Sequence, residues 1–229
     1  MVGNDIVDVI DLEAEAEAEA EAEETRVRFD ARICRADERE AIARSSSPSR
    51  ERWCHWAAKE AAYKLFKKQL PATIFSPIRF EVDLEPEPKS WKSGLNRPEV
   101  RRGVVCHGAS RRALAIEWVE GSAVHARVTP IQESEENLVV GHDWLQVSSG
   151  QQLTPERLSH AVRALACNRI AKRLGTDPSK LSITRRERIP ELRKRGVLFG
   201  ADLSLSHHGR VVAFACRLPS SLLIERLAS

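Results

Sequence analysis

Apolar residues recur at helical spacing in residues 53–68, "WCHWAAKEAAYKLFKK". The stripe consists of Cys54, Ala58, Ala61, Ala62 and Leu65. Trp53 and Trp56 widen this stripe on one side, where Glu60 also projects, and Lys64 lies one turn further along. A glutamate followed at this spacing by a lysine is usually a solvent-exposed pair that stabilises a helix only slightly. Here the pair borders the aromatic side, and a partly dehydrated carboxylate needs a cation or a metal ion nearby.

Further patterns predict the elements around this helix. Alternation rich in Val and Ile predicts a short strand near residues 2–8, and residues 25–44 look helical up to a serine cluster. Strands are expected at 75–85, at two places within 102–130 around a turn at Gly121, at 181–188 and within 203–218. Residues 154–175 predict an amphipathic helix that begins at a Thr cap followed by Pro and ends at Gly175. The Glu-Ala tract, residues 13–24, has no apolar face and is either a solvated helix or a disordered insertion.

The two halves of the chain echo one another. Residues 3–7 resemble 141–145, residues 55–66 resemble 163–174, and residues 107–119 resemble 206–217, in the same order. This predicts an α+β fold with a duplicated, pseudo-twofold unit, each half being a small antiparallel sheet packed with helices. We expect the first half at 1–128, a linker and the start of the second repeat at 129–150, and the second half at 151–229. Because the first half keeps Glu60 and the second has Asn168 but an intact "SLSHHG" turn, we expect one active site between the halves.

Composition limits the class of protein. The chain has 229 residues, a formal net charge of +3 and five cysteines, with no CxxC motif. Scattered cysteines, no leader-like start and no long apolar run predict a reduced, soluble, cytoplasmic protein with no membrane partner. The basic run at 185–195 is either a solvated face or a contact for phosphates or an acidic partner. Only Phe199 lies near it, so a base-stacking nucleic-acid platform is not expected.

Spaced motifs resemble the 4'-phosphopantetheinyl transferase superfamily. "GNDIVD" followed by "WAAKEAAYK" resembles the family's G-x-D strand and W/F-x-x-K-E-x-x-x-K helix, with an intervening segment like that of holo-acyl-carrier-protein synthases. Residues 159–216 resemble the N-terminal half of the surfactin-synthetase-activating type, so the halves stand in exchanged order. Three positions depart from the family pattern. Val7 stands where a second acidic ligand is common, Arg188-Ile189-Pro190 replaces G-K-P, and His208 takes the third position of S-H-S.

The resemblance implies a transferase that moves phosphopantetheine from coenzyme A to a serine of a carrier protein. Cleaving a pyrophosphate calls for a hard cation, and the resemblance implies that Asp5 and Glu60 hold Mg²⁺. Glu60 is the first candidate for the general base and Lys64 the second, and Lys64 could instead neutralise a phosphate. An alternative is a non-catalytic module that only binds coenzyme A or a carrier.

Further residues are assigned to coenzyme A. His207 would contact a phosphate, although it could also be a structural histidine in a turn. Ser206 would cap that turn or touch the nucleotide, and Lys59 could reach the substrate only from the helix edge. Arg163, and less directly Arg188, would hold the 3'-phosphate or the adenine end, although exposed arginines are usually solvated.

The carrier implied by the family is a small acidic helical bundle. Basic residues near the site are candidate docking contacts for it, namely Arg28, Arg32, Lys67 and Lys68. Two fused halves make a monomer the expected state.

Overall fold

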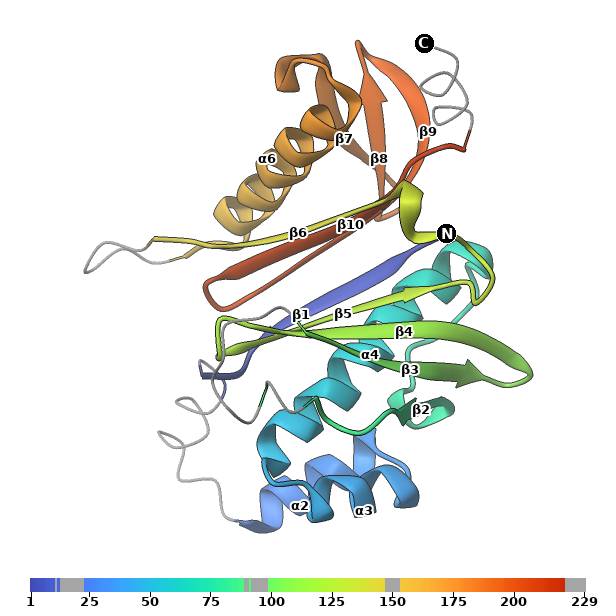
Figure 1. Ribbon diagram of the computed structural model, residues 1–229, viewed down its shortest axis with the longest axis vertical. Coiled ribbons are helices and arrows are strands. Elements are labelled where there is room, and N and C mark those ends of the chain that lie inside the picture. The colour runs from blue at the N-terminus through green and yellow to red at the C-terminus, as the bar shows by residue number, and fades with distance from the viewer. Residues whose placement is uncertain (11, 13–22, 89–90, 92–98, 147–152, 221–229) are drawn as a thin grey trace.

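The computed structural model describes residues 1–10, 12, 23–88, 91, 99–146 and 153–220. Two five-stranded antiparallel sheets form the two halves, which Figure 1 shows stacked one above the other. The strand orders are β1-β5-β4-β3-β2 and β6-β10-β9-β8-β7, so both halves have the same topology. The prediction of an α+β fold with a duplicated unit is confirmed.

The elements of the first half are β1 (Gly3–Asp8), α2 (Glu23–Ile33), α3 (Ala36–Arg44), α4 (Pro48–Gln69), the 3-10 turn η1 (Pro77–Arg79), β2 (Phe80–Leu84), β3 (Val100–His107), β4 (Ser110–Val119) and β5 (Ala123–Thr129). Those of the second half are η2 (Glu135–Asn137), β6 (Leu138–Trp144), α6 (Pro155–Leu174), η3 (Pro178–Lys180), β7 (Leu181–Arg186), β8 (Ile189–Lys194), β9 (Val197–His208) and β10 (Val211–Arg217). Thus β6 lies within the range assigned from the sequence to the linker and the start of the second repeat.

Helix α4 is the central helix of the first half. Every residue of its predicted apolar stripe is fully buried, as the spacing required. The helix packs on β1, where a Cβ at Gly3 would lie 2.0 Å from the carbonyl oxygen of Ala61 and 2.9 Å from the amide nitrogen of Leu65. Glycine therefore allows strand and helix to approach closely, and Asp5, two residues further along, lies on the same face of β1 as Gly3.

Helix α6 occupies the equivalent place in the second half. Thr154 caps its start by accepting a hydrogen bond from the amide of Arg157 at 3.3 Å. Gly175 ends it with a φ of 63°, a conformation that favours glycine. The predicted helix boundaries are confirmed. Its buried residues pack with Leu192, Leu203 and Phe214 of the sheet.

Three local predictions need correction. Residues 102–130 contain three strands, because Gly108, with a φ of 58°, allows a tight turn between β3 and β4 in addition to the one at Gly121. The basic run at 185–195 contributes a strand, β8, which pairs with β7 across the turn at Glu187 and Arg188. The helical prediction for 25–44 covers two helices, separated at Cys34 and Arg35.

The predicted pairing of the two repeats is also wrong by one hairpin. Because the two strand orders match, the β9–β10 hairpin is the counterpart of β4–β5. The sequence comparison had paired it with 107–119, the segment around the β3–β4 turn. Of the Glu-Ala tract, residues 13–22 lie outside the described part of the chain.

Strand β1 joins the two halves. One of its edges pairs with β5, and the amides on its other edge point to β9. The amides of Asn4 and Ile6 donate to the hydroxyls of Ser204 and Ser206 at 3.0 and 3.2 Å, and the amide of Asp8 contacts Nδ1 of His208 at 3.3 Å. Side chains of the second half therefore satisfy backbone donors of the first, which fixes the register between the halves.

A buried cation and an apolar cluster reinforce this interface. Lys68 Nζ donates to the carbonyl oxygens of Val2 and Leu203 at 2.7 and 2.8 Å and to Asp202 Oδ1 at 2.9 Å. The apolar cluster consists of Ile6, Val119, Ala123, Val211 and Ala213. Lys68 is thus occupied in holding the halves together, which does not fit its predicted contact with a carrier.

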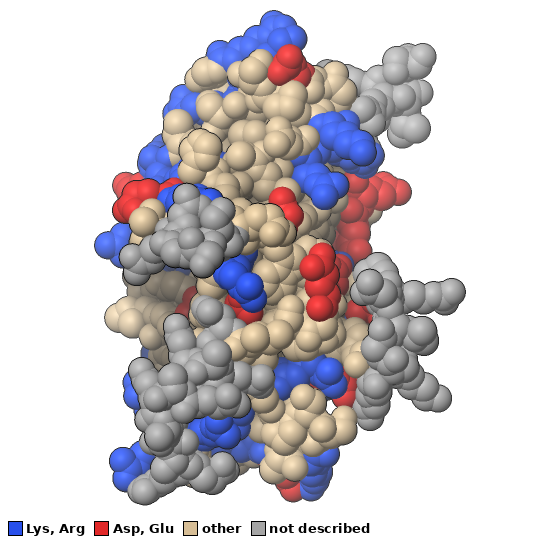
Figure 2. All heavy atoms as spheres, turned by 90° about the vertical axis from the view of Figure 1, so that its left-hand side faces the viewer, with Lys and Arg blue, Asp and Glu red and all other residues tan. Residues whose placement is uncertain are grey.

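Side chains of both charges lie on the face of the molecule shown in Figure 2. On the face shown in Figure 2, acidic and basic side chains are interspersed among neutral ones. This distribution agrees with the nearly balanced net charge of +3. Among the described helices, none is long and apolar enough to cross a membrane.

Candidate active site between the halves

Three elements meet at Asp5. This residue lies in the middle of β1 and faces α4, and its side chain is only 10 % exposed. Lys64 Nζ of α4 lies 2.7 Å from Asp5 Oδ1, and the Ser206 hydroxyl of β9 donates to the same oxygen at 2.7 Å. Lys64 Nζ also lies 3.2 Å from Ser206 Oγ. The first half thus supplies a carboxylate and an ammonium, and the second half supplies a hydroxyl.

Glu60 lies one turn before Lys64 on α4. The pKa of its carboxyl is raised from 4.5 to about 7, chiefly by burial and also by the negative charge of Asp5, against the opposing effect of Lys64. Repulsion between Asp5 and Glu60 means that the two carboxyl groups are close enough to interact. The ammonium of Lys64 therefore lies near two carboxyl groups. It neutralises the charge of Asp5, which it contacts, more fully than that of Glu60.

The aromatic residues near Glu60 are packed against one another. The ring of Phe29 in α2 lies 5.7 Å from that of Trp53 and 5.9 Å from that of Trp56. Trp56 also meets Phe75 at 5.8 Å in an edge-on arrangement. These contacts fill the wide side of the helix with apolar surface, in keeping with the burial of Glu60.

His207 lies at the end of β9, next to Ser206, and is accessible to solvent. Partial desolvation lowers the pKa of its ring, and the cations of Lys64 and Arg185 lower it further, while Asp5 opposes them. The ring therefore lies within electrostatic range of Lys64 and Asp5. The structure thus brings Asp5, Lys64 and Ser206 into direct contact, and Glu60 and His207 lie within electrostatic range of them.

A group of cations borders His207. Arg163 in α6 donates to the backbone oxygen of Ser159 at 2.9 Å and also to its hydroxyl, and Arg185 of β7 lies 3.4 Å from that hydroxyl. Burial and the nearby charge of Arg185 lower the pKa of Arg163. Among the described residues, no carboxylate pairs with either arginine. Sequence reasoning missed Arg185 as an individual residue, since only the basic run contained it.

Two predicted coenzyme A residues lie outside this group. Lys59 is fully buried, with Nζ 2.6 Å from Glu38 Oε2 and 2.8 Å from the carbonyl oxygen of Ile33. It ties α4 to α3, and a contact with coenzyme A does not fit its burial. Arg188 lies exposed in the β7–β8 turn with a φ of 70° and makes no contact with the group among the described residues.

The donor set suits a hard divalent cation. Asp5 and Glu60 offer carboxylate oxygens, which Mg²⁺ prefers, and no hydrogen bond engages Asp5 Oδ2 within the described part of the chain. Val7, where a further acidic ligand is common in the family, lies buried in the apolar core at 1 % exposure. Position 7 therefore adds no acidic ligand to Asp5 and Glu60.

Comparison with known proteins identifies a family. The model of a family described as the 4'-phosphopantetheinyl transferase superfamily matches residues 1–117, which is about half of the 229-residue chain. This span contains Asp5, Glu60 and Lys64, whereas Ser206 and His207 lie outside it. No curated protein matches the chain.

Proposed function

Because the chain belongs to the 4'-phosphopantetheinyl transferase superfamily, we propose that it transfers phosphopantetheine from coenzyme A to a serine hydroxyl of an apo carrier protein. The observation that carries this proposal is the meeting of Asp5, Lys64 and Ser206 within 3.2 Å. Glu60 and His207 lie within electrostatic range of Asp5 and Lys64. These residues come from both halves, as a single shared site requires.

Asp5 and Glu60 would hold Mg²⁺. When bound, this ion supplies charge stabilisation at the pyrophosphate oxygens. The two carboxyl groups suit a divalent cation because they repel one another and Lys64 only partly offsets their negative charge. The ammonium of Lys64, which lies 2.7 Å from Asp5 Oδ1, would add a second positive charge near the pyrophosphate.

Glu60 is the proposed general base. An ionised carboxylate on α4, facing the cleft between the halves, can accept the proton that the carrier serine loses. Its burial limits competition by water for that proton. Lys64 is the second candidate for this role, and substitution at each position separates the two.

His207, Ser206, Arg163 and Arg185 would bind the phosphates of coenzyme A. The two guanidinium groups converge on Ser159 and have no carboxylate partner in the described residues. Burial and then the charge of Arg185 lower the pKa of Arg163, and an anion bound between the two guanidinium groups would offset both effects. Arg188 is retained as a peripheral contact, since the β7–β8 turn is exposed.

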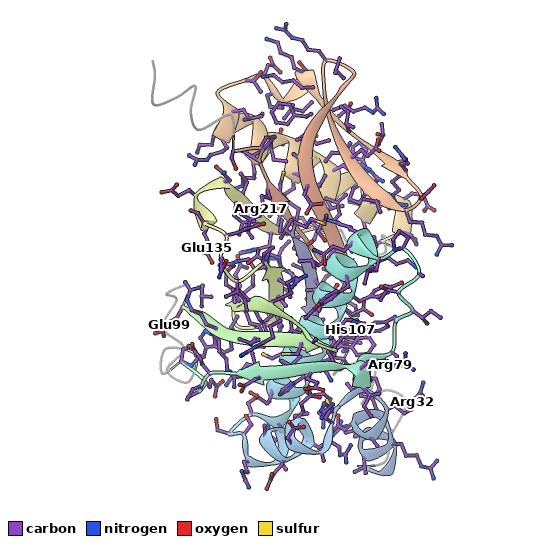
Figure 3. All side chains as sticks on the ribbon, turned by 90° about the vertical axis from the view of Figure 1, so that its right-hand side faces the viewer. Arg32, Arg79, Glu99, His107, Glu135 and Arg217 are labelled. Atoms are coloured by element: carbon purple, nitrogen blue, oxygen red, sulfur yellow. The ribbon has the colours of Figure 1, made fainter. Side chains whose placement is uncertain are left out.

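The proposed partner is an acidic, helical carrier protein. Arg32 of α2 and Arg79 of η1 lie on the same side of the first half (Figure 3) and are both exposed. Ile78, which precedes Arg79 in the chain, and Ile74 are 44 % and 80 % exposed. Basic residues around exposed aliphatic ones suit an acidic partner with an apolar contact. The proposal also includes a monomeric state. Since the five cysteines are free thiols, it includes a cytoplasmic location as well.

The test is transfer itself. The full chain is incubated with coenzyme A, Mg²⁺ and a panel of apo carrier proteins, and mass spectrometry follows the addition of phosphopantetheine, ~340 Da. Asp5→Asn and Glu60→Gln should remove the addition, whereas Glu40→Gln, an exposed carboxylate that pairs with Arg44 on α3, should not. Absence of the addition with every carrier, together with tight binding of coenzyme A, would support the alternative of a non-catalytic binding module.

A further inference from the structure

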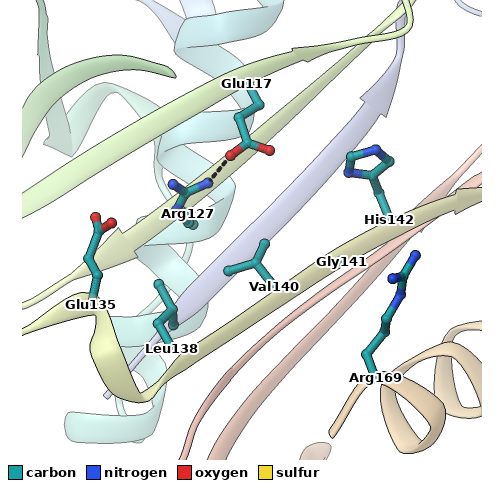
Figure 4. A pocket seen from close by; sticks show the side chains of 8 residues that line it. All are labelled: Glu117, Arg127, Glu135, Leu138, Val140, Gly141, His142 and Arg169. Carbon is teal, nitrogen blue, oxygen red and sulfur yellow. Dashed lines mark hydrogen bonds and ion pairs between the residues drawn. The ribbon is translucent and has the colours of Figure 1, made fainter. Parts of the chain in front are cut away.

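A second cluster of metal-binding side chains lies between the halves, on the other face of β1 from Asp5. Neighbouring residues of a strand point to opposite faces, so Asn4 faces away from α4 and contacts His125 of β5. Glu117 of β4 is the direct cross-strand partner of His125, and His142 comes from β6 of the second half. One donor atom from each of these three residues lies within 4.8 Å of the others. Figure 4 shows Glu117 and His142 facing the same space.

His125 provides an independent indication of a ligand. The residue is fully buried, and its Nε2 lies 3.3 Å from the Asn4 amide nitrogen, while its Nδ1 has no hydrogen-bond partner in the described part of the chain. Buried polar atoms are nearly always paired. Oδ1 of Asn4 is also without a partner among the described residues. If the amide presents this oxygen to the ring, Nε2–H donates to it and Nδ1 keeps its lone pair. A second-shell partner orients metal-binding histidines in this way.

The space beside the cluster leaves room for a further ligand. A cavity of about 390 Å³ is lined by Glu117, Arg127, Glu135, Leu138, Val140, Gly141, His142 and Arg169 (Figure 4). Arg127 Nη1 donates to Glu117 Oε1 at 2.5 Å, which leaves the other carboxylate oxygen for a metal ion. Arg127 and Arg169 add positive charge at the cavity, so the remaining coordination position suits water or a small anion.

We propose that Glu117, His125 and His142 bind a zinc-type divalent ion that joins the two halves. Two imidazoles and one carboxylate are the ligand set that zinc takes with one open position, whereas Mg²⁺ prefers the all-oxygen set at Asp5 and Glu60. Zinc–ligand distances near 2 Å place neighbouring donors about 3.3 Å apart, so small side-chain rotations close the site from its present spacing. Since His142 belongs to the second half and the other two ligands to the first, binding stabilises their association.

The experiment measures binding and stability, so it can be read whether or not transfer is detected. The full chain is treated with a chelator, supplied with excess Mg²⁺ to load Asp5 and Glu60, and titrated with Zn²⁺ by calorimetry. We expect one Zn²⁺ per chain and a rise in the melting temperature. Co²⁺ bound in place of Zn²⁺ should show the visible absorption typical of a four-coordinate site.

The decisive variant is His142→Ala, because His142 is partly exposed whereas replacing the buried His125 could unfold the protein. Losing even an outer-shell partner weakens metal binding about 10- to 100-fold, so the loss of a ligand should cost at least that. Glu117→Gln should act in the same direction, and His160→Ala, which removes an exposed histidine of α6, should bind as the unaltered chain does. Circular dichroism checks that each variant is folded. Absence of Zn²⁺ binding, binding unchanged by His142→Ala, or binding lost in His207→Ala would overturn the proposal.

Discussion

Lys64 Nζ lies 2.7 Å from Asp5 Oδ1, which ties the central helix of the first half to the strand that joins the halves. The ammonium offsets the charge of Asp5 more directly than that of Glu60, whose pKa burial and Asp5 raise to about 7. One cation therefore serves two carboxyl groups. The excess of negative charge that would attract a divalent ion also makes the stability of the metal-free protein depend on pH.

Glu60→Gln should remove activity and stabilise the metal-free protein at pH 8. Between pH 4.5 and about 7 the folded state keeps a proton that the unfolded state has released, so stability falls as pH rises through this window. The amide removes that loss, which should raise the free energy of unfolding at pH 8 by about 1–3 kcal/mol. Transfer should fall by about 10²- to 10⁴-fold. Thermal unfolding with a chelator checks the first effect, and a gain of equal size at pH 5 would contradict it.

Lys59→Met should destabilise the protein without changing the KM for coenzyme A. The substitution leaves Glu38, which is 2 % exposed, without its ammonium partner. Breaking a buried pair in this way costs about 3–5 kcal/mol. Urea unfolding and steady-state kinetics on the folded fraction check the two parts. A raised KM at unchanged stability would instead restore the predicted contact with the cofactor.

Arg185→Ala should weaken binding of coenzyme A more than that of its analogue without the 3'-phosphate. Charged hydrogen bonds contribute about 1.5–3 kcal/mol, so the KM for coenzyme A should rise roughly 10- to 100-fold. The KM for 3'-dephospho-coenzyme A should change little. Arg111→Ala, at an exposed position of β4, is the matched control. An equal rise in KM for both substrates would show that Arg185 contacts a part of coenzyme A other than its 3'-phosphate.

Glu51→Gln should reduce stability at pH 7 and weaken its dependence on acid. Burial alone would raise the pKa of Glu51, but His55 and the guanidinium of Arg101, at 2.6 and 3.1 Å, lower it from 4.5 to about 2. The stabilisation is therefore complete above pH 4.5 and is lost as pH falls towards 2. Its size is about 3 kcal/mol. Unfolding followed by fluorescence between pH 2 and 7 tests this, and parallel pH curves for the two proteins would refute it.

Gly3→Ala should prevent stable folding or displace α4. The added Cβ would meet the backbone of α4 at 2.0 Å, where no flexible side chain can move aside. We expect a loss of at least 4 kcal/mol. Gly108→Ala is the control, because nothing lies within 4 Å of a Cβ there and only its φ of 58° is strained, at a cost near 1 kcal/mol. Similar melting temperatures for the two variants would show that β1 and α4 pack less closely than this distance indicates.

Local patterns predicted the parts of the fold that depend on neighbouring residues. The apolar stripe of α4 is buried as its spacing required, and Thr154 and Gly175 bound α6 because caps act within one turn. Strand β8 was missed because its charged residues read as a solvated run, although pairing with β7 and β9 makes them a strand. The turn at Gly108 was missed because the strands on either side read as one continuous pattern.

The sequence by itself determined the duplicated α+β plan and the meeting of Glu60 and Lys64 on one helix face, since periodicity and motif spacing act along a single stretch of chain. Only the tertiary structure decided that Ser206 bonds Asp5, that Lys59 faces α3, and that His125 meets His142. The first outcome depends on how β1 docks against β9, the second on how α3 packs on α4, and the third on the sides of β5 and β6 from which the two histidines project. The docking of β1 on β9 is set by contacts between segments about 200 residues apart, over which no local propensity extends.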